Sequence, residues 1–217
     1  MNANPSGARN FLDRNRILNV AIDFANTQGA DALTMRKLAQ HLNCGVMSLY
    51  NHVANKDELL TDMLDRVVGE FDPPVFTGDW KGTMRASAQS ANRVLLEHHW
   101  AVGEWNLRMP GPNRIRYMDS ILKVMTLAGL SSPIIYRGYH AITMHIVGFS
   151  QQQIGYHKAL GPEFAPKVEG FLSGLGDAHP YLADHVQAHL DETEDCDEFL
   201  FVLDLILDGL DPSSPSS

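Results

Sequence analysis

The chain has 217 residues, of which 17 are lysine or arginine and 26 are aspartate or glutamate, giving a formal net charge of −9. This length allows one large domain or two smaller ones with a buried core. No uninterrupted apolar run is long enough to cross a bilayer, which argues against a membrane-spanning helix. Taken as a whole, the acidic balance also argues against a protein that binds a polyanion.

The charge is divided unevenly along the chain. Residues 1–56 contain six basic and three acidic side chains, which leaves +3 there and −12 for the remainder. Such an asymmetry indicates that one part meets a polyanion while the other keeps the molecule soluble. The N-terminus lacks the apolar core of a signal peptide, and two cysteines far apart, Cys44 and Cys196, fit a reducing compartment. We therefore expect a cytoplasmic protein.

Residues 1–10 are expected to form a flexible arm, followed by a helix that ends at Gly29, a suitable C-cap. Arg9, Arg14 and Arg16 lie near the start of this helix. They could reach a phosphate or a minor groove, or they could be solvated surface side chains. The helix is predicted from apolar residues at helical spacing, namely Ile17, Leu18, Ala21, Ile22 and Ala25.

The next stretch predicts two short helices joined by a tight turn. Thr34 is a good N-cap for the first, and Gly45 allows the backbone to turn before the second, Val46 to Val53. Leu49 and Val53 lie four residues apart on the inner face of the second helix. Two short helices joined in this way match a helix-turn-helix, whose second helix enters the DNA major groove. Asn55 then caps a connecting helix over residues 56–71, which Pro73 ends.

The runs LTMRKLAQHL and SLYNHVANKDELL resemble the DNA-binding domain of the tetracycline-repressor-like (TetR) family of bacterial transcriptional regulators. The resemblance covers about residues 14 to 71, and its LYxHVxNKxxLL core is specific for a motif of this size. The later run LLEHHWAVGEWNLRMPGPNRIRYMDSILKVMTLAGL is similar, more loosely, to the ligand-binding domain of one branch of the family.

The resemblance implies roles for individual residues. Tyr50, His52 and Lys56 match positions that contact phosphate, Ser48 one that touches a base or phosphate, and Arg36 one that reaches guanine in some members. A guanidinium can bind guanine O6 and N7 together. Val46 and Met47 depart from the polar residues or proline of many relatives, so they either read thymine methyl groups or pack in the core. The predicted DNA-binding residues are Thr34, Arg36, Val46, Met47, Ser48, Tyr50, Asn51, His52 and Lys56.

After a break over residues 72–79, apolar stripes predict a second, larger helical domain over residues 80–210. We expect helices from Trp80 to about Val102, over 115–125, from Ser131 or Ser132 to about Tyr156, over 181–190 and over 199–210. Residues 161–176 are less regular. The last helix is apolar around most of its girth, so a second copy of the chain is expected to cover it. The predicted dimer interface is Phe199, Val202, Leu203, Ile206 and Leu210, and residues 211–217 are an expected disordered tail.

Large adaptable side chains gather in the middle helices, where they could line an effector pocket or simply pack in the core. His140 and His145 are five residues apart, which places their rings on different helical faces and disfavours a metal site. We predict neither a metal nor a cofactor. The candidate pocket residues are Trp100, Trp105, Met109, Tyr117, Met125 and Met144.

These patterns predict an all-α homodimer with an N-terminal three-helix helix-turn-helix domain and a larger helical ligand-binding and dimerisation domain. The resemblance implies a transcriptional repressor that binds a palindromic operator and is released by a small hydrophobic or aromatic inducer. One alternative keeps the DNA-binding domain but replaces the inducer with a protein partner or with dimerisation alone. An enzyme is disfavoured because the sequence contains no nucleophile elbow, phosphate-binding glycine loop or zinc signature.

Overall fold

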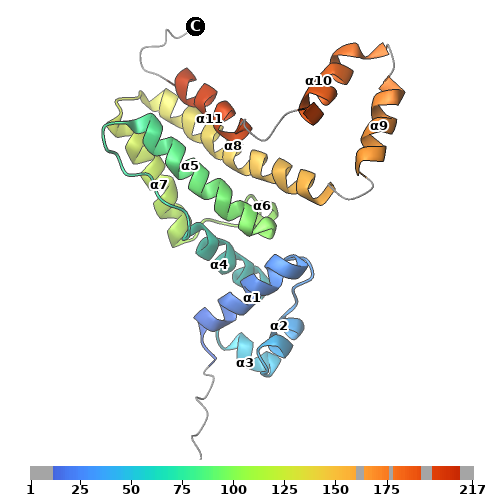
Figure 1. Cartoon of the computed structure of the whole chain (residues 1–217). Coiled ribbons are helices and arrows are strands. Elements are labelled where there is room, and N and C mark those ends of the chain that lie inside the picture. The colour runs from blue at the N-terminus through green and yellow to red at the C-terminus, as the bar shows by residue number, and fades with distance from the viewer. Residues whose placement is uncertain (1–11, 160–163, 176–177, 192–196, 211–217) are drawn as a thin grey trace, which may run out of the picture. The chain divides into compact units, whose positions relative to one another are not determined.

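The computed structural model describes residues 12–159, 164–175, 178–191 and 197–210, which contain α-helices and no β-strand (Figure 1). The prediction of an all-α fold is therefore confirmed. The predicted flexible arm, the predicted disordered tail and Cys196 lie outside the described residues.

The chain divides into two compact units, and both are discontinuous in sequence. Residues 1–69 and 97–115 form unit 1, and residues 70–96 and 116–217 form unit 2. The sequence prediction placed residues 80–210 in one domain, whereas residues 97–115 group with the N-terminal residues. Unit 1 contains α1 (Arg14–Gln28), α2 (Met35–His41), α3 (Val46–Tyr50), α4 (Lys56–Val68) and α6 (His99–Glu104).

Three side-chain caps fix where the helices of unit 1 begin. Asp13, Thr34 and Asn55 accept hydrogen bonds from the amides of Arg16, Lys37 and Glu58, respectively. Thr34 and Asn55 were predicted to do this from the sequence. Gly29 ends α1 with φ at 83°, a conformation that favours glycine. The core between these helices contains the fully buried Ile17, Leu38, Leu49, Leu59 and Met63.

The turn between α2 and α3 differs from the sequence prediction. Gly45 was expected to supply unusual backbone angles, but its φ is −72°, which any residue can adopt. Asn43 takes the left-handed conformation instead, with φ at 53°. Asparagine tolerates this region better than most residues with a Cβ, so the turn does not require glycine at position 45.

Unit 2 is built around α5 (Trp80–Glu97), the greater part of α7 (Pro112–Leu127), α8 (Ser132–Ala159) and α11 (Glu198–Gly209). Helix α11 packs beside α8 (Figure 1). Gly129 follows α7 with φ at 81°, in agreement with the predicted end of that helix. The centre of the unit contains the fully buried Met84, Leu95, Ile121, Met125 and Ile142.

Two helices of unit 2 pack against each other, α9 (Phe164–Leu175) and α10 (Pro180–Asp191). Helix α9 occupies most of the stretch whose irregular pattern predicted no clear element. No helix in the described part of the chain is long and apolar enough to span a membrane.

Candidate nucleic-acid interface

Helices α2 and α3 form the predicted helix-turn-helix. Leu49 in α3 and Val53 just after it are buried, with 0% and 1% of their surface exposed. They anchor a helix of only five residues, which is too short to be stable alone. The position of α3 therefore depends on its packing against the rest of unit 1.

The opposite side of α3 faces outward. Met47 is 75% exposed and Tyr50 is 43% exposed, so neither residue packs in the core of the chain. Among the other predicted DNA-binding residues, Thr34, Arg36 and Asn51 are exposed, whereas Val46, Ser48, His52 and Lys56 are half-buried.

Arg14, the first residue of α1, binds the segment that follows α3. Its guanidinium donates hydrogen bonds to the carbonyl oxygen of His52, to Oε1 of Glu58 at 2.8 Å and to Asp62. This arginine was considered from sequence as a phosphate ligand, and sequence reasoning missed its internal role. The sequence offered only an indirect signal, the two acids Glu58 and Asp62 four residues apart in the connecting helix, a like-charge pair that a nearby cation relieves. Nothing in the sequence identifies Arg14 as that cation.

The two acids respond differently to Arg14. The hydrogen bond from Arg14 lowers the pKa of Glu58, and the amide of Ala54 adds to this effect. Burial of the carboxyl group raises the pKa of Asp62, and this outweighs the opposing effect of the guanidinium charge. The two carboxyl groups are therefore shifted in opposite directions, Glu58 by its hydrogen bonds and Asp62 by burial.

Residues 97–115 are held against α1 and α4 inside unit 1. Oδ1 of Asn26 accepts hydrogen bonds from Nε1 of Trp100 at 2.8 Å and from Nδ1 of His98 at 3.0 Å. Arg108 pairs with Asp57 at the start of α4, at 2.8 Å, and with Glu104 at 2.7 Å. These bonds join α6 and the loop after it to both helices.

The end of α4 supplies a cap for α7. The carboxylate of Asp65 accepts hydrogen bonds from the amides of Asn113 at 3.1 Å and Arg114 at 2.9 Å. Both amides belong to the first turn of α7, where the helix itself offers no acceptor. A side chain at Gly111 would come within 2.5 Å of Asp65, so the close approach requires glycine.

The six residues predicted to line an effector pocket are divided equally between the two units. Trp100 and Trp105 are buried in unit 1, where the guanidinium of Arg114 lies 4.1 Å from the indole ring of Trp105. Met109, also in unit 1, is exposed. In unit 2, Tyr117 and Met125 are buried, whereas Met144 is 73% exposed.

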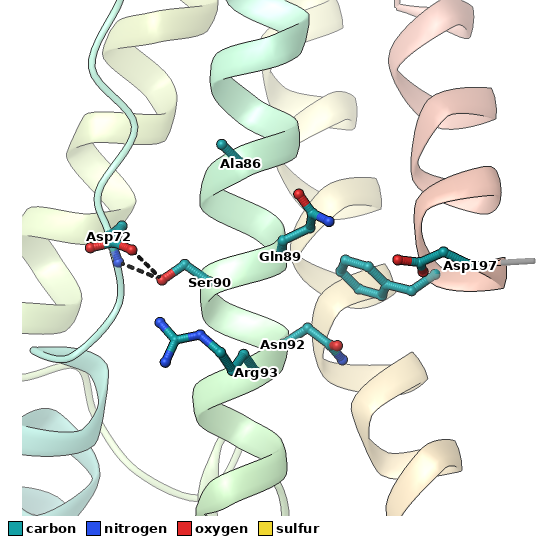
Figure 2. Close-up of a pocket in the computed structure, with 8 residues that line it drawn as sticks. Asp72, Ala86, Gln89, Ser90, Asn92, Arg93 and Asp197 are labelled. Carbon is teal, nitrogen blue, oxygen red and sulfur yellow. Dashed lines mark hydrogen bonds between the residues drawn. The ribbon is translucent and has the colours of Figure 1, made fainter. Parts of the chain in front are cut away.

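Unit 2 contains an open cleft of about 430 Å³, which is lined by residues 86–93 of α5, by Asp72 and by residues at the start of α11 (Figure 2). The hydroxyl of Ser90 accepts a hydrogen bond from the backbone amide of Asp72 at 3.0 Å and donates one to the carboxylate of Asp72 at 2.8 Å. The side-chain amide of Asn92 donates to Ser150 and Gln153, both at 2.9 Å. The sequence prediction named none of the lining residues as a pocket residue, and it assigned Phe199 to the dimer interface. The lining consists of Asp72, Ala86, Gln89, Ser90, Asn92, Arg93, Asp197 and Phe199.

Tyr117 and His145 are titratable groups in the interior of unit 2. Burial raises the pKa of Tyr117 to about 12, despite a hydrogen bond from Ser87. Burial lowers the pKa of His145, so the neutral imidazole donates from Nε2 to the carbonyl oxygen of Phe199 at 2.8 Å. The ring of His145 also stacks on that of Phe199, with centroids 4.7 Å apart. His145 thereby ties α8 to α11.

The predicted dimer-interface residues divide between two sides of α11. Phe199 and Leu203 are buried within the chain, whereas Val202 is exposed and Ile206 and Leu210 are half-buried. Two further apolar side chains that the prediction omitted, Phe201 and Leu205, are 60% and 58% exposed.

Comparison with known proteins shows family matches in both parts of the chain. Residues 17–63 match the family described as "Bacterial regulatory proteins, tetR family", and residues 73–213 match "Tetracyclin repressor-like, C-terminal domain". The transcriptional repressor DrrR1 of Streptomyces coeruleorubidus is 30% identical over 94% of this chain and 79% of its own length. The class A tetracycline repressor from transposon 1721 of Escherichia coli is 28% identical over 63% of this chain and 65% of its own.

Solved structures of ActR, a TetR family protein of Streptomyces coelicolor, are similar over almost the whole chain. ActR in complex with actinorhodin has a TM-score of 0.79 and 28% identity, covering 92% of this chain and 97% of ActR. ActR in complex with (S)-DNPA has a TM-score of 0.76 with the same identity and coverage. The chain therefore belongs to the TetR family of DNA-binding bacterial transcriptional regulators.

Proposed function

We propose that this protein is a homodimeric repressor that places α3 in the major groove of a palindromic operator. The observation that carries the proposal is the two-sidedness of α3, with Leu49 buried and Met47 and Tyr50 exposed. The second helix of a helix-turn-helix needs exposed side chains on its outer face, because these side chains contact the bases and phosphates. Such a regulator acts where bacterial DNA lies, in the cytoplasm.

The exposed side chains suggest which contacts each residue makes. Met47 and the neighbouring Val46 cannot donate hydrogen bonds, so we assign them to thymine methyl groups. Arg36 is the candidate for a guanine contact. Thr34, the N-cap of α2, is assigned to the same DNA-binding surface. Phosphate contacts are assigned to Tyr50, Ser48, Asn51, His52 and Lys56.

Dimerisation is assigned to the outer face of α8 and α11. Phe201 and Leu205 lie four residues apart on α11 and are both more than half exposed, and Met144 on α8 is 73% exposed. Large exposed apolar side chains on adjacent helices favour an interface with another copy of the same surface. Val202, Ile206 and Leu210 would complete this interface, while Phe199 and Leu203 support it from within the chain.

We assign the inducer to unit 2. ActR, whose structures are similar over nearly the whole chain, is known in complex with actinorhodin and with (S)-DNPA. The cleft beside Gln89 and Phe199 is the candidate entry point, and the buried Tyr117 and Met125 could line a deeper part. A coupling of about 1–3 kcal/mol between inducer and operator would change occupancy several-fold or more.

We propose that α4 transmits the inducer signal by pivoting. Because Asp57 binds Arg108 and Asp65 binds the amides of Asn113 and Arg114, α4 would move together with residues 108–114 rather than slide past them. The three parts of the chain where it passes between units, near residues 69, 96 and 115, are the only covalent routes for the signal. An inducer that released DNA without displacing α4 in either bound form would contradict this pivot.

The DNA assignment is tested by Tyr50→Ala and Lys56→Ala. The measurement is the affinity of each variant, over a range of salt concentrations, for an operator obtained by selection from random duplex DNA. Each variant should weaken binding while the dimer stays folded. Lys56→Ala should also reduce the slope of log K against log salt by about one unit. Tyr181→Ala and Lys123→Ala remove exposed residues of the same types from unit 2 and serve as matched controls. Unchanged operator binding by both Tyr50→Ala and Lys56→Ala would refute the assignment.

A further inference from the structure

We propose that Arg14 and Glu58 form a clamp that sets the orientation of α3, and that Arg14 acts on DNA affinity as a positioning residue rather than as a phosphate ligand. The proposal rests on the proposed function, because it concerns the helix assigned to DNA. It changes what a substitution at Arg14 should do to operator binding.

The first half of the clamp runs from α1 to the residues after α3. Arg14 donates to the carbonyl oxygen of His52, which lies two residues beyond the last residue of α3. The same guanidinium donates to Glu58 at 2.8 Å and to Asp62, which both belong to α4. The side chain of Arg14 therefore joins α1 to the turn that follows α3 and to α4.

The second half runs from α4 back to the same turn. Oε2 of Glu58 accepts a hydrogen bond from the amide of Ala54 at 2.9 Å. Oδ1 of Asn55 accepts one from the amide of Glu58 at 2.8 Å. The turn between α3 and α4 is thus held at the carbonyl of His52 by Arg14 and at the amide of Ala54 by Glu58.

Helix α3 needs this support because it has little of its own. It contains five residues, and its N-cap Gly45 has no side chain to bind the first-turn amides. The phosphate-contact candidates His52 and Lys56 lie within or directly after the clamped turn. A loosened turn would displace these side chains and the end of α3 together.

The charges of the clamp do not suit a phosphate site. Arg14 lies between Glu58 and Asp62, so the three side chains carry a net charge of −1 when both acids are ionised. A guanidinium whose charge is already matched gains little from a nearby phosphate. The charge on Glu58 would in fact repel DNA, so charge alone predicts that its removal strengthens binding.

Charge alone and the clamp therefore predict opposite effects of Glu58→Gln on operator affinity, which makes this variant a direct test. A glutamine keeps the shape of glutamate but has one acceptor oxygen where two are used, so its amino group must face either Arg14 or the amide of Ala54, which are both donors. The clamp predicts that Glu58→Gln weakens operator binding by about fivefold or more. Asp23→Asn removes an exposed acid from α1 of the same unit and is the matched control, with binding unchanged or slightly tighter.

Arg14→Lys is the second variant. Lysine keeps the positive charge that a phosphate contact needs but lacks the planar fork that reaches several acceptors. We expect a similar loss of affinity with no change in the salt slope, whereas Lys56→Ala should flatten that slope by about one unit. Thermal melting of each variant establishes that the dimer remains folded, and if one variant fails to fold, the other decides the question.

The proposal would be overturned if folded Glu58→Gln bound the operator as tightly as the wild type or more tightly. It would also be overturned if Arg14→Lys kept wild-type affinity. Failure of the proposed function has a different signature, namely Tyr50→Ala and Lys56→Ala that leave operator binding unchanged.

Discussion

The indole of Trp100 donates a hydrogen bond of 2.8 Å to the side-chain oxygen of Asn26, across 74 positions of sequence. Because an indole nitrogen can only donate, the atom that accepts must be the oxygen of Asn26. The same oxygen lies 3.0 Å from Nδ1 of His98, which is therefore also a donor. One exposed asparagine of α1 thus fixes the residues on which α6 begins.

Replacement of Asn26 should loosen α6 from α1. Asn26→Ala removes the common acceptor of two buried donors, so we expect unit 1 to lose about 1–2 kcal/mol of stability. Thermal or urea unfolding of the purified dimer measures this loss. Asn19→Ala removes an exposed asparagine from the same helix and should change stability little. Equal stability of the two variants would mean that the bonds to Trp100 and His98 contribute nothing.

The stability of unit 2 should fall as the solution becomes acidic, because of His145. Burial lowers the pKa of His145 in the folded chain below its ordinary value of 6.5. At pH 7.5 the imidazole is neutral in both states, but below about pH 6.5 the unfolded chain takes up a proton that the folded chain excludes. Stability is therefore full above that pH and falls as the pH decreases toward the lowered pKa.

The measurement is the melting temperature at pH 7.5 and pH 5.5 for the wild type, His145→Gln and His140→Gln. From pH 7.5 to pH 5.5, we expect the melting temperature of the wild type to fall by about 1 °C or more beyond the fall of His145→Gln. His140→Gln removes an imidazole from the exposed side of the same helix and should behave like the wild type. The same pH dependence in the wild type and His145→Gln would exclude the role assigned to His145.

The exposed face of α11 gives a prediction about assembly. Phe201→Glu with Leu205→Glu would place two unpaired charges in the proposed interface, and we expect the dimer to weaken by about a hundredfold or more. Sedimentation at micromolar concentration measures the change. Phe171→Glu alters a similarly exposed aromatic residue on α9 and is the control. A doubly substituted protein that remained as dimeric as the control would place the interface elsewhere.

The cleft of unit 2 can be tested by filling it. Gln89 on α5 and Asp197 before α11 both line this cleft (Figure 2). Gln89→Trp should reduce the affinity of an inducer found by thermal-shift screening about tenfold, while operator binding without inducer stays unchanged. Gln151→Trp, at an exposed position of α8, controls for the added indole. An inducer that bound Gln89→Trp and the control equally would not use this cleft.

The sequence predicted those features that depend on residues close together along the chain. The caps at Thr34 and Asn55 and the end of α1 at Gly29 are local, since each follows from side-chain and backbone chemistry within about four residues. The inward Leu49 and Val53 follow from helical periodicity alone. These local rules, with the family resemblance, were sufficient to identify the helix-turn-helix.

Features that depend on distant contacts were not predictable in the same way. The apolar stripe from Trp80 was expected to continue to about Val102, but α5 ends at Glu97 and His98 turns toward Asn26. Nothing near His98 in the sequence marks this break. Arg14 likewise has no local signal that separates an internal ion pair from a phosphate contact, because its acids lie 44 and 48 positions away.

The central claim is that α3 reads DNA from a twofold-symmetric dimer, and selection of bound sequences from random duplex DNA by the wild-type protein tests it most directly. We predict that the enriched sequences form an inverted repeat with half-site centres separated by about 34–36 Å, or one helical turn, or a multiple of this distance. Enrichment of a single asymmetric site, or no enrichment at modest ionic strength, would contradict the claim.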